Sequence, residues 1–128
     1  MYCLDTNIVV DYLRGDKKVI ENVKEIASSG KIFITSISLC ELYKGLHLSP
    51  KAQEELFILD NFANSVDILD LSLPICRRFG ERFAFLEKKG LTINDFDLMI
   101  AVIADANNLT LITKDKDFMR AGTKVEMW

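Results

Sequence analysis

The sequence predicts an α/β fold, a three-layer α/β/α sandwich around a mostly parallel, five-stranded sheet. Short apolar runs alternate with segments of helical periodicity along the whole chain, which is typical of parallel strands joined by helices. Several of these runs stop at an acidic or hydroxyl side chain, beginning with Asp5 after the first run. The apolar stretch at residues 98–104 indicates a helix that is buried on every side.

The elements follow from these patterns in order. Strands are expected at residues 2–4, 32–34, 66–69, 109–112 and 125–127, each a short run rich in apolar side chains. Helices are expected at about 8–14, 19–27, 37–47, 49–63, 73–89 and 97–104, with Gly30 and Gly90 following two of them. No repeat or flexible linker interrupts the pattern, so residues 1–128 are expected to form a single domain.

Composition narrows the class of protein. With 128 residues, 49% of them hydrophobic, the chain can bury about two-thirds of its unfolded surface. It has no apolar run long enough for a membrane span and no secretion signal, which predicts a soluble, cytoplasmic protein without membrane association. Cys3, Cys40 and Cys76 are odd in number and flanked by apolar residues, so we expect reduced core thiols. The net charge of −3 argues against wholesale electrostatic binding of nucleic acid but not against a local basic rim around an acidic site.

Four acidic residues each follow a strand or lie near the start of a helix. Because the carboxyl ends of parallel strands meet at one edge of a sheet, these side chains are expected to converge there. The four are Asp5, Glu41, Asp97 and Asp115.

Each acid also has an ordinary structural interpretation. Asp5 is a good N-cap residue, and Ser38-x-x-Glu41 matches a capping box in which the glutamate bonds the N-cap amide. Asp97 would interact favourably with a helix dipole, and Asp115 with Asp117 would suit a solvated turn. From the residues alone, both interpretations stay open for all four.

Four carboxylates in one place repel one another, and a divalent cation relieves that repulsion. Magnesium prefers hard oxygen ligands and keeps several waters, and a pair of such ions can activate water toward a phosphodiester. The sequence lacks the residues that other kinds of active site need. His47 is the single histidine, and no glycine-rich phosphate loop or metal-type cysteine spacing occurs. An acidic, metal-dependent site remains.

Four motifs in register carry a family resemblance over essentially the whole chain. They are Leu4-Asp5-Thr6-Asn7, Thr35-Ser36 followed by Glu41, Asn94-Asp95-x-Asp97-Leu98-x-Ile100-Ala101, and Thr113-Lys114-Asp115-x-Asp117-Phe118. With these motifs the chain resembles the PIN-domain ribonucleases, and within them the VapC toxins of toxin–antitoxin pairs.

The resemblance implies a PIN-like three-layer fold and endonucleolytic cleavage of RNA that depends on Mg²⁺ or Mn²⁺. In-line attack by a water that the carboxylates orient is the expected mechanism, and it would leave a 5′-phosphate and a 3′-hydroxyl. The resemblance also implies that Asp5, Glu41, Asp97 and Asp115 are the metal-binding, catalytic acids, with Asp117 as the competitor of Asp115. It further implies that neighbouring side chains orient the carboxylates; these are Thr6, Asn7, Ser36, Thr113 and Asp117. The expected partners are an RNA substrate, a cognate antitoxin and a second copy in a homodimer.

Basic side chains near the acids are candidates for holding RNA phosphates, although a lysine-rich turn is often only solvated. They are Lys44, Lys114, Lys116 and Arg120.

Two other functions stay open. A phospho-accepting α/β domain, such as a receiver or a haloacid-dehalogenase-type phosphatase, also places an aspartate after its first strand. Asp70 after the third strand favours a receiver, but Asn7 stands where the phosphatase needs a second acid. Neither class explains Glu41 or Asp97. The other alternative is a PIN-like domain that binds RNA or protein without catalysis.

Overall fold

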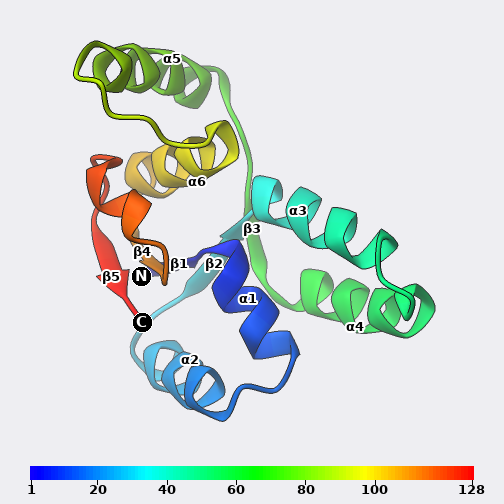
Figure 1. Ribbon diagram of the computed structural model, residues 1–128. Coiled ribbons are helices and arrows are strands. Elements are labelled where there is room, and N and C mark those ends of the chain that lie inside the picture. The colour runs from blue at the N-terminus through cyan, green and yellow to red at the C-terminus, as the bar shows by residue number, and fades with distance from the viewer.

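The computed structural model describes all 128 residues as a parallel sheet surrounded by helices (Figure 1). The strand order is β3-β2-β1-β4-β5, and every neighbouring pair is parallel. In chain order the elements are β1 (Tyr2–Leu4), α1 (Thr6–Leu13), α2 (Lys17–Ser29), β2 (Ile32–Thr35), α3 (Ser36–His47), α4 (Ala52–Ser65), β3 (Asp67–Leu69), α5 (Leu73–Lys88), α6 (Asp95–Ala106), β4 (Thr110–Thr113), the 3₁₀-helix η1 (Lys116–Arg120) and β5 (Val125–Met127).

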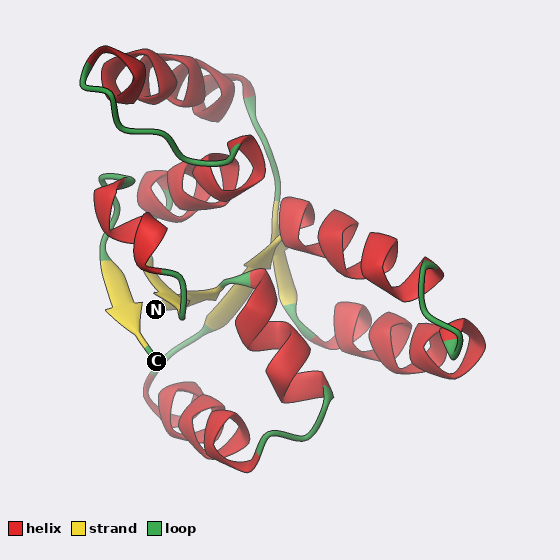
Figure 2. Ribbon diagram, viewed as in Figure 1, coloured by secondary structure: helices red, strands yellow, loops and turns green.

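Alternate strand residues enter two different cores, because successive side chains of a strand point to opposite faces. Leu4 and Ile112 pack with residues of α1, α2, α3 and α4 on one face of the sheet. Cys3 and Leu111 pack with residues of α6 and η1 on the other, where α5 covers α6 (Figure 2). The predicted three-layer architecture is therefore confirmed, with a sheet that is wholly rather than mostly parallel.

Helix α6 is the buried helix that the apolar stretch predicts. Leu98 and every residue from 100 to 104 are buried, so the helix lies in the core between the sheet, α3 and α5. The side chain of Asn94 caps the helix by accepting a hydrogen bond from the Phe96 amide at 2.9 Å. The buried turns thus anchor an N-terminus that carries Asp95 and Asp97.

Helix α5 begins at the predicted residue, and the other five helices begin one to three residues away from the predicted start, with α1 and α4 showing the cause. Helix α1 begins at Thr6 rather than Ile8, because Asp5 acts as its N-cap directly after the strand. Helix α4 begins at Ala52 rather than at Ser49-Pro50, which lie in the preceding turn. Both differences arise at caps, where one or two residues decide the boundary.

The expectation of three core thiols is wrong for two of them. Cys3 is buried, and its burial, together with the nearby charge of Asp5, raises the pKa of its thiol to about 12. Cys40 and Cys76 are exposed on α3 and α5. Their apolar sequence neighbours point to other faces of the same helices, so flanking residues do not report on the burial of a helical cysteine.

The strand order also bears on the receiver alternative. Receiver-type folds order their strands 2-1-3-4-5, whereas this sheet places β1 in its centre between β2 and β4. The connectivity is therefore that of a different α/β class. None of the helices combines the length and apolar character needed to cross a membrane.

The packing of α6 generates a stability prediction. Leu98, with 1% of its surface exposed, sits one residue beyond Asp97. Leu98→Ala should lower the free energy of unfolding by about 2–5 kcal/mol because it leaves a cavity in a packed core. Leu48→Ala, at a position that is 79% exposed, is the matched control and should change it by less than about 0.5 kcal/mol. Equal effects in urea unfolding would contradict this packing of α6.

Candidate functional site

A cleft of about 380 Å³ lies where β1, α1, α3, α6 and the segment after β4 come together. It is lined by nine residues, and the four acids that the sequence places together are among them. These acids are Asp5, Glu41, Asp97 and Asp115; the other five lining residues are Thr6, Asn7, Lys44, Asn94 and Phe96.

Asp5 is the most buried of the acids, with 3% of its surface exposed. Leu4 of β1 pairs with Ile112 of β4, so the next residue of each strand, Asp5 and Thr113, are also neighbours. Asp5 accepts a hydrogen bond from the Thr6 amide to Oδ1 and one from the Thr113 hydroxyl to Oδ2, both at 2.8 Å. Burial raises the pKa of Asp5, and these two hydrogen bonds oppose that rise.

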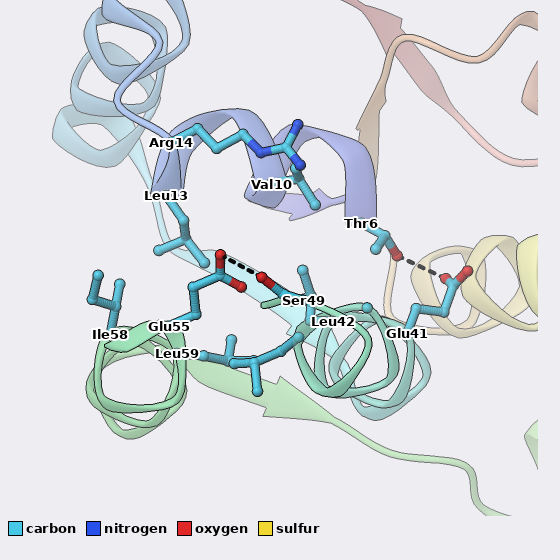
Figure 3. A pocket seen from close by; sticks show the side chains of 12 residues that line it. Thr6, Val10, Leu13, Arg14, Glu41, Leu42, Ser49, Glu55, Ile58 and Leu59 are labelled. Atoms are coloured by element: carbon cyan, nitrogen blue, oxygen red, sulfur yellow. Dashed lines mark hydrogen bonds between the residues drawn. The ribbon is translucent and has the colours of Figure 1, made fainter. Parts of the chain in front are cut away.

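Glu41 reaches the cleft from the second turn of α3. Its Oε1 accepts a hydrogen bond from the Thr6 hydroxyl at 2.8 Å, which joins α1 to α3 (Figure 3). The capping-box interpretation of Glu41 is wrong, because Thr35 is the N-cap of α3 and its side chain bonds the Ser38 amide at 3.0 Å. The carboxylate of Glu41 is therefore directed toward the cleft.

Asp97 lies in the first turn of α6, half-buried, and its carboxylate has no hydrogen-bond or ion-pair partner. Burial raises the pKa of Asp97 to about 6, and the charges of Asp5 and Glu41 add to the rise. Asp97 has no hydrogen-bond or ion-pair partner and is surrounded by other carboxylates, so its charge is the most unfavourable one in the cleft.

Asp115 and Asp117 separate in space. Asp115 lines the cleft and also caps η1, since its Oδ1 accepts a hydrogen bond from the Asp117 amide at 2.9 Å. The Asp117 carboxylate is exposed and pairs with Arg120 at 3.0 Å. The geometry thus favours Asp115 as the fourth acid, while its predicted turn-capping role is also present.

Two of the predicted orienting residues, Ser36 and Asn7, make no hydrogen bond with the four acids of the cleft. The Ser36 hydroxyl donates to Asp70 at 2.6 Å, and neither residue lines the cleft. The prediction that Ser36 orients one of the four acids is therefore wrong, because its hydroxyl is directed to Asp70 after the edge strand β3. Asn7 does line the cleft, but its side chain makes no hydrogen bond with the protein.

The four basic candidates have different surroundings. Lys44 lines the cleft, and Lys116 is exposed without an ion pair. Lys114 is paired with Asp11 of α1. The Arg120 guanidinium donates to the Thr92 carbonyl as well as to Asp117, which ties η1 to the loop before α6. Only Lys44 and Lys116 are therefore without competing contacts in the protein.

Sequence reasoning missed Asn94 and Phe96 as cleft residues. Both flank Asp95 at the N-terminus of α6, next to Asp97. The first turn of this helix faces the cleft. The closeness of Asn94 and Phe96 to Asp97 in the sequence was therefore the signal that could have identified them as cleft residues.

The donor set suits a hard cation. All four acids offer carboxylate oxygens in one cleft, and their mutual repulsion would fall when a cation binds. No three histidine, cysteine or acidic side chains, however, lie close enough together to enclose an ion. A cation in the cleft would therefore be held by one or two carboxylates and would keep several waters, as Mg²⁺ commonly does.

A second hollow, of about 340 Å³, adjoins the acid cleft and shares Thr6 and Glu41 with it. It lies between α1, α3 and α4 (Figure 3), and half of its lining residues are hydrophobic. At its far end the Ser49 hydroxyl donates to Glu55 at 3.0 Å. The acid cleft is thus bordered by a second hollow, and half of the residues that line this hollow are aliphatic.

The raised pKa of Asp97 predicts a pH-dependent gain in stability when its charge is removed. An unfolded aspartate titrates near 3.9, so between about pH 4 and 6 the folded state binds the additional proton and loses stability as the pH rises. In a chelating buffer, Asp97→Asn should raise the melting temperature at pH 7, and the gain should shrink toward pH 4.

Asp95→Asn is the control, since it removes an exposed charge from the same helical turn. It should give no such pH-dependent gain. If both variants behaved alike in melting experiments across this pH range, crowding of acids around Asp97 would be refuted.

Several characterised proteins and solved structures are similar to this chain along nearly its whole length. The chain is 38% identical to Ribonuclease VapC2 of Rickettsia felis over 94% of this chain and 91% of that protein. It is 28% identical to the tRNA(fMet)-specific endonuclease VapC of Shigella flexneri, over 99% and 97%. A chain of the Rickettsia felis VapBC2 crystal structure, bound to a DNA fragment from their promoter, superimposes with a TM-score of 0.92 at 36% identity, covering 99% of this chain and 98% of that one.

The family model described as the PIN domain matches residues 2–124. This match contains all four acids of the cleft and all elements except β5. The fold, the acid cleft and the similarity along the chain therefore agree, and the chain belongs to the PIN-domain family.

Proposed function

We propose that this protein is a metal-dependent endoribonuclease that acts as the toxin of a toxin–antitoxin pair. The observation that carries the proposal is the convergence of four carboxylates in one cleft of a chain that is 38% identical to a ribonuclease. A cleft of this kind would be an energetic burden without a function, because burial and repulsion both disfavour its charges.

Asp5 and Asp97 are proposed as the principal metal ligands, with Glu41 and Asp115 completing the site. Thr113 would fix the orientation of Asp5, and Thr6 would fix that of Glu41, through the hydrogen bonds that each donates. A bound Mg²⁺ or Mn²⁺ would supply Lewis-acid stabilisation of charge on the phosphate and make a nearby water more acidic. The carboxylates would orient that water for in-line attack, leaving a 5′-phosphate and a 3′-hydroxyl.

RNA phosphates are proposed to contact Lys44 at the cleft and Lys116 at the start of η1, the two candidates that are without ion pairs. Lys114 and Arg120 would contribute only by exchanging their contacts with Asp11 and Asp117. The chain's net charge of −3 makes such local contacts more important than a general attraction to RNA.

A cognate antitoxin, a homodimeric state and a cytoplasmic location complete the proposal. Support for the antitoxin comes from solved structures of relatives described as VapBC complexes, including those from Rickettsia felis and Haemophilus influenzae. The antitoxin would prevent cleavage until it is removed.

Cleavage of a pool of structured RNAs tests the activity directly. Wild-type protein should cut in Mg²⁺ or Mn²⁺ and fail to cut in a chelator. Asp5→Asn and Asp97→Asn should each lower the rate by at least about 100-fold, because each would remove a metal ligand. Asp70→Asn is the matched control, since Asp70 follows the edge strand β3, lies outside the cleft and should leave the rate unchanged.

Cleavage that persists in both cleft variants would refute the proposed role of the acids. RNA binding without cleavage in any metal would instead favour the non-catalytic alternative. Mapping of the product ends by ligation and labelling would check the proposed 5′-phosphate.

A further inference from the structure

One apolar side chain lies in the acid cleft. Phe96 is 44% exposed and is the only hydrophobic residue among the nine that line the cleft. The other exposed phenylalanines, Phe57, Phe83 and Phe85, belong to α4 and α5 and do not line it. Single exposed hydrophobic residues are common on protein surfaces, so the distinctive feature of this ring is its position inside the acid cleft.

The backbone of Phe96 is held firmly. Its amide donates to the Asn94 side chain at 2.9 Å, and Asn94 also lines the cleft. Beyond Asp97 the helix enters the core, where Leu98 and residues 100–104 are buried. The ring is therefore carried by a rigid helical turn rather than by a loop, as a binding platform requires.

The charge of the cleft makes an uncharged contact valuable. Four carboxylates line it and Lys44 is its only basic residue, so ionic attraction for an anionic strand is weak there. Stacking of a nucleobase on an aromatic ring does not depend on phosphate charge, and it strengthens binding by about 5- to 100-fold per base.

We infer that Phe96 is the stacking platform for one unpaired nucleobase of the RNA, next to the phosphodiester that enters the acid cleft. The inference rests on the proposed ribonuclease function and adds the requirement that one nucleotide next to the cleavage site is unstacked. A base held in a helix has both faces covered by its neighbours, so the nucleotide that contacts Phe96 must be unstacked. Substrates should accordingly be cut in loops, bulges or single strands.

The test uses an RNA that the wild-type protein cuts, with its cleavage site mapped. Phe96→Leu should raise KM about 5- to 100-fold with a much smaller change in kcat, whereas Phe96→Tyr should restore KM because it keeps the ring. Phe57→Leu is the matched control, since Phe57 is 71% exposed on α4 and lies outside the cleft. It should leave both constants unchanged.

Binding without cleavage gives a second readout. In the Asp5→Asn background and with chelator, fluorescence anisotropy of the labelled RNA should show the same loss of affinity on Phe96→Leu. RNAs with one abasic nucleotide at each position near the cleavage site complete a double-mutant cycle. At one position the abasic change should weaken binding to the protein that retains Phe96. It should leave binding to the Phe96→Leu variant unaffected, because the stacking contact is already absent there.

The outcomes separate this inference from the proposed function. Metal-dependent cleavage with unchanged KM and affinity in Phe96→Leu would overturn the stacking role and leave the nuclease intact. Unchanged RNA kinetics combined with loss of a co-purifying protein partner would assign the ring to a protein interface and also overturn the inference. If the wild-type protein neither cleaved nor bound any RNA, both the stacking inference and the proposed ribonuclease function would be overturned.

Discussion

The carboxylate of Asp5 is the point on which the rest of the site depends. The pairing of β1 with β4 brings Thr113 beside it, and Asp5 in turn begins α1 by capping it. Thr6, the first residue of that helix, donates its hydroxyl to Glu41. A strand register, a helix cap and an interhelical hydrogen bond therefore form one connected set of contacts around a buried charge.

The repulsion among the acids at this edge of the sheet is offset by the burial of apolar side chains elsewhere in the chain. Burial raises the pKa of both Asp5 and Asp97, so each carboxylate destabilises the folded state when it is charged. Helix α6 compensates by burying its apolar turns directly behind Asp97. Stored repulsion of this kind is expected where a protein binds a cation, whose arrival would relieve the repulsion and stabilise the fold.

Periodicity and apolar runs are sufficient to predict the five strands and the buried helix, because these depend on local pattern. They leave the role of the four acids open, and it is the family resemblance that singles these acids out. The partners of individual side chains were less predictable. Thr35 caps α3 in place of Ser38, and Asp70 takes the hydroxyl of Ser36. Cys40 faces solvent despite its apolar neighbours. Each outcome is decided by the direction in which a helix presents its side chains, which depends on tertiary packing.

The location of a bound cation tests the central claim most directly. Crystals grown or soaked with Mn²⁺ can be examined at the manganese absorption edge, where the anomalous signal identifies the ion. We predict a peak in the acid cleft, coordinated by Asp5 and Asp97 and lost in Asp5→Asn crystals treated in the same way. Strong manganese peaks only outside the cleft, in protein that cleaves RNA with Mn²⁺, would contradict the account.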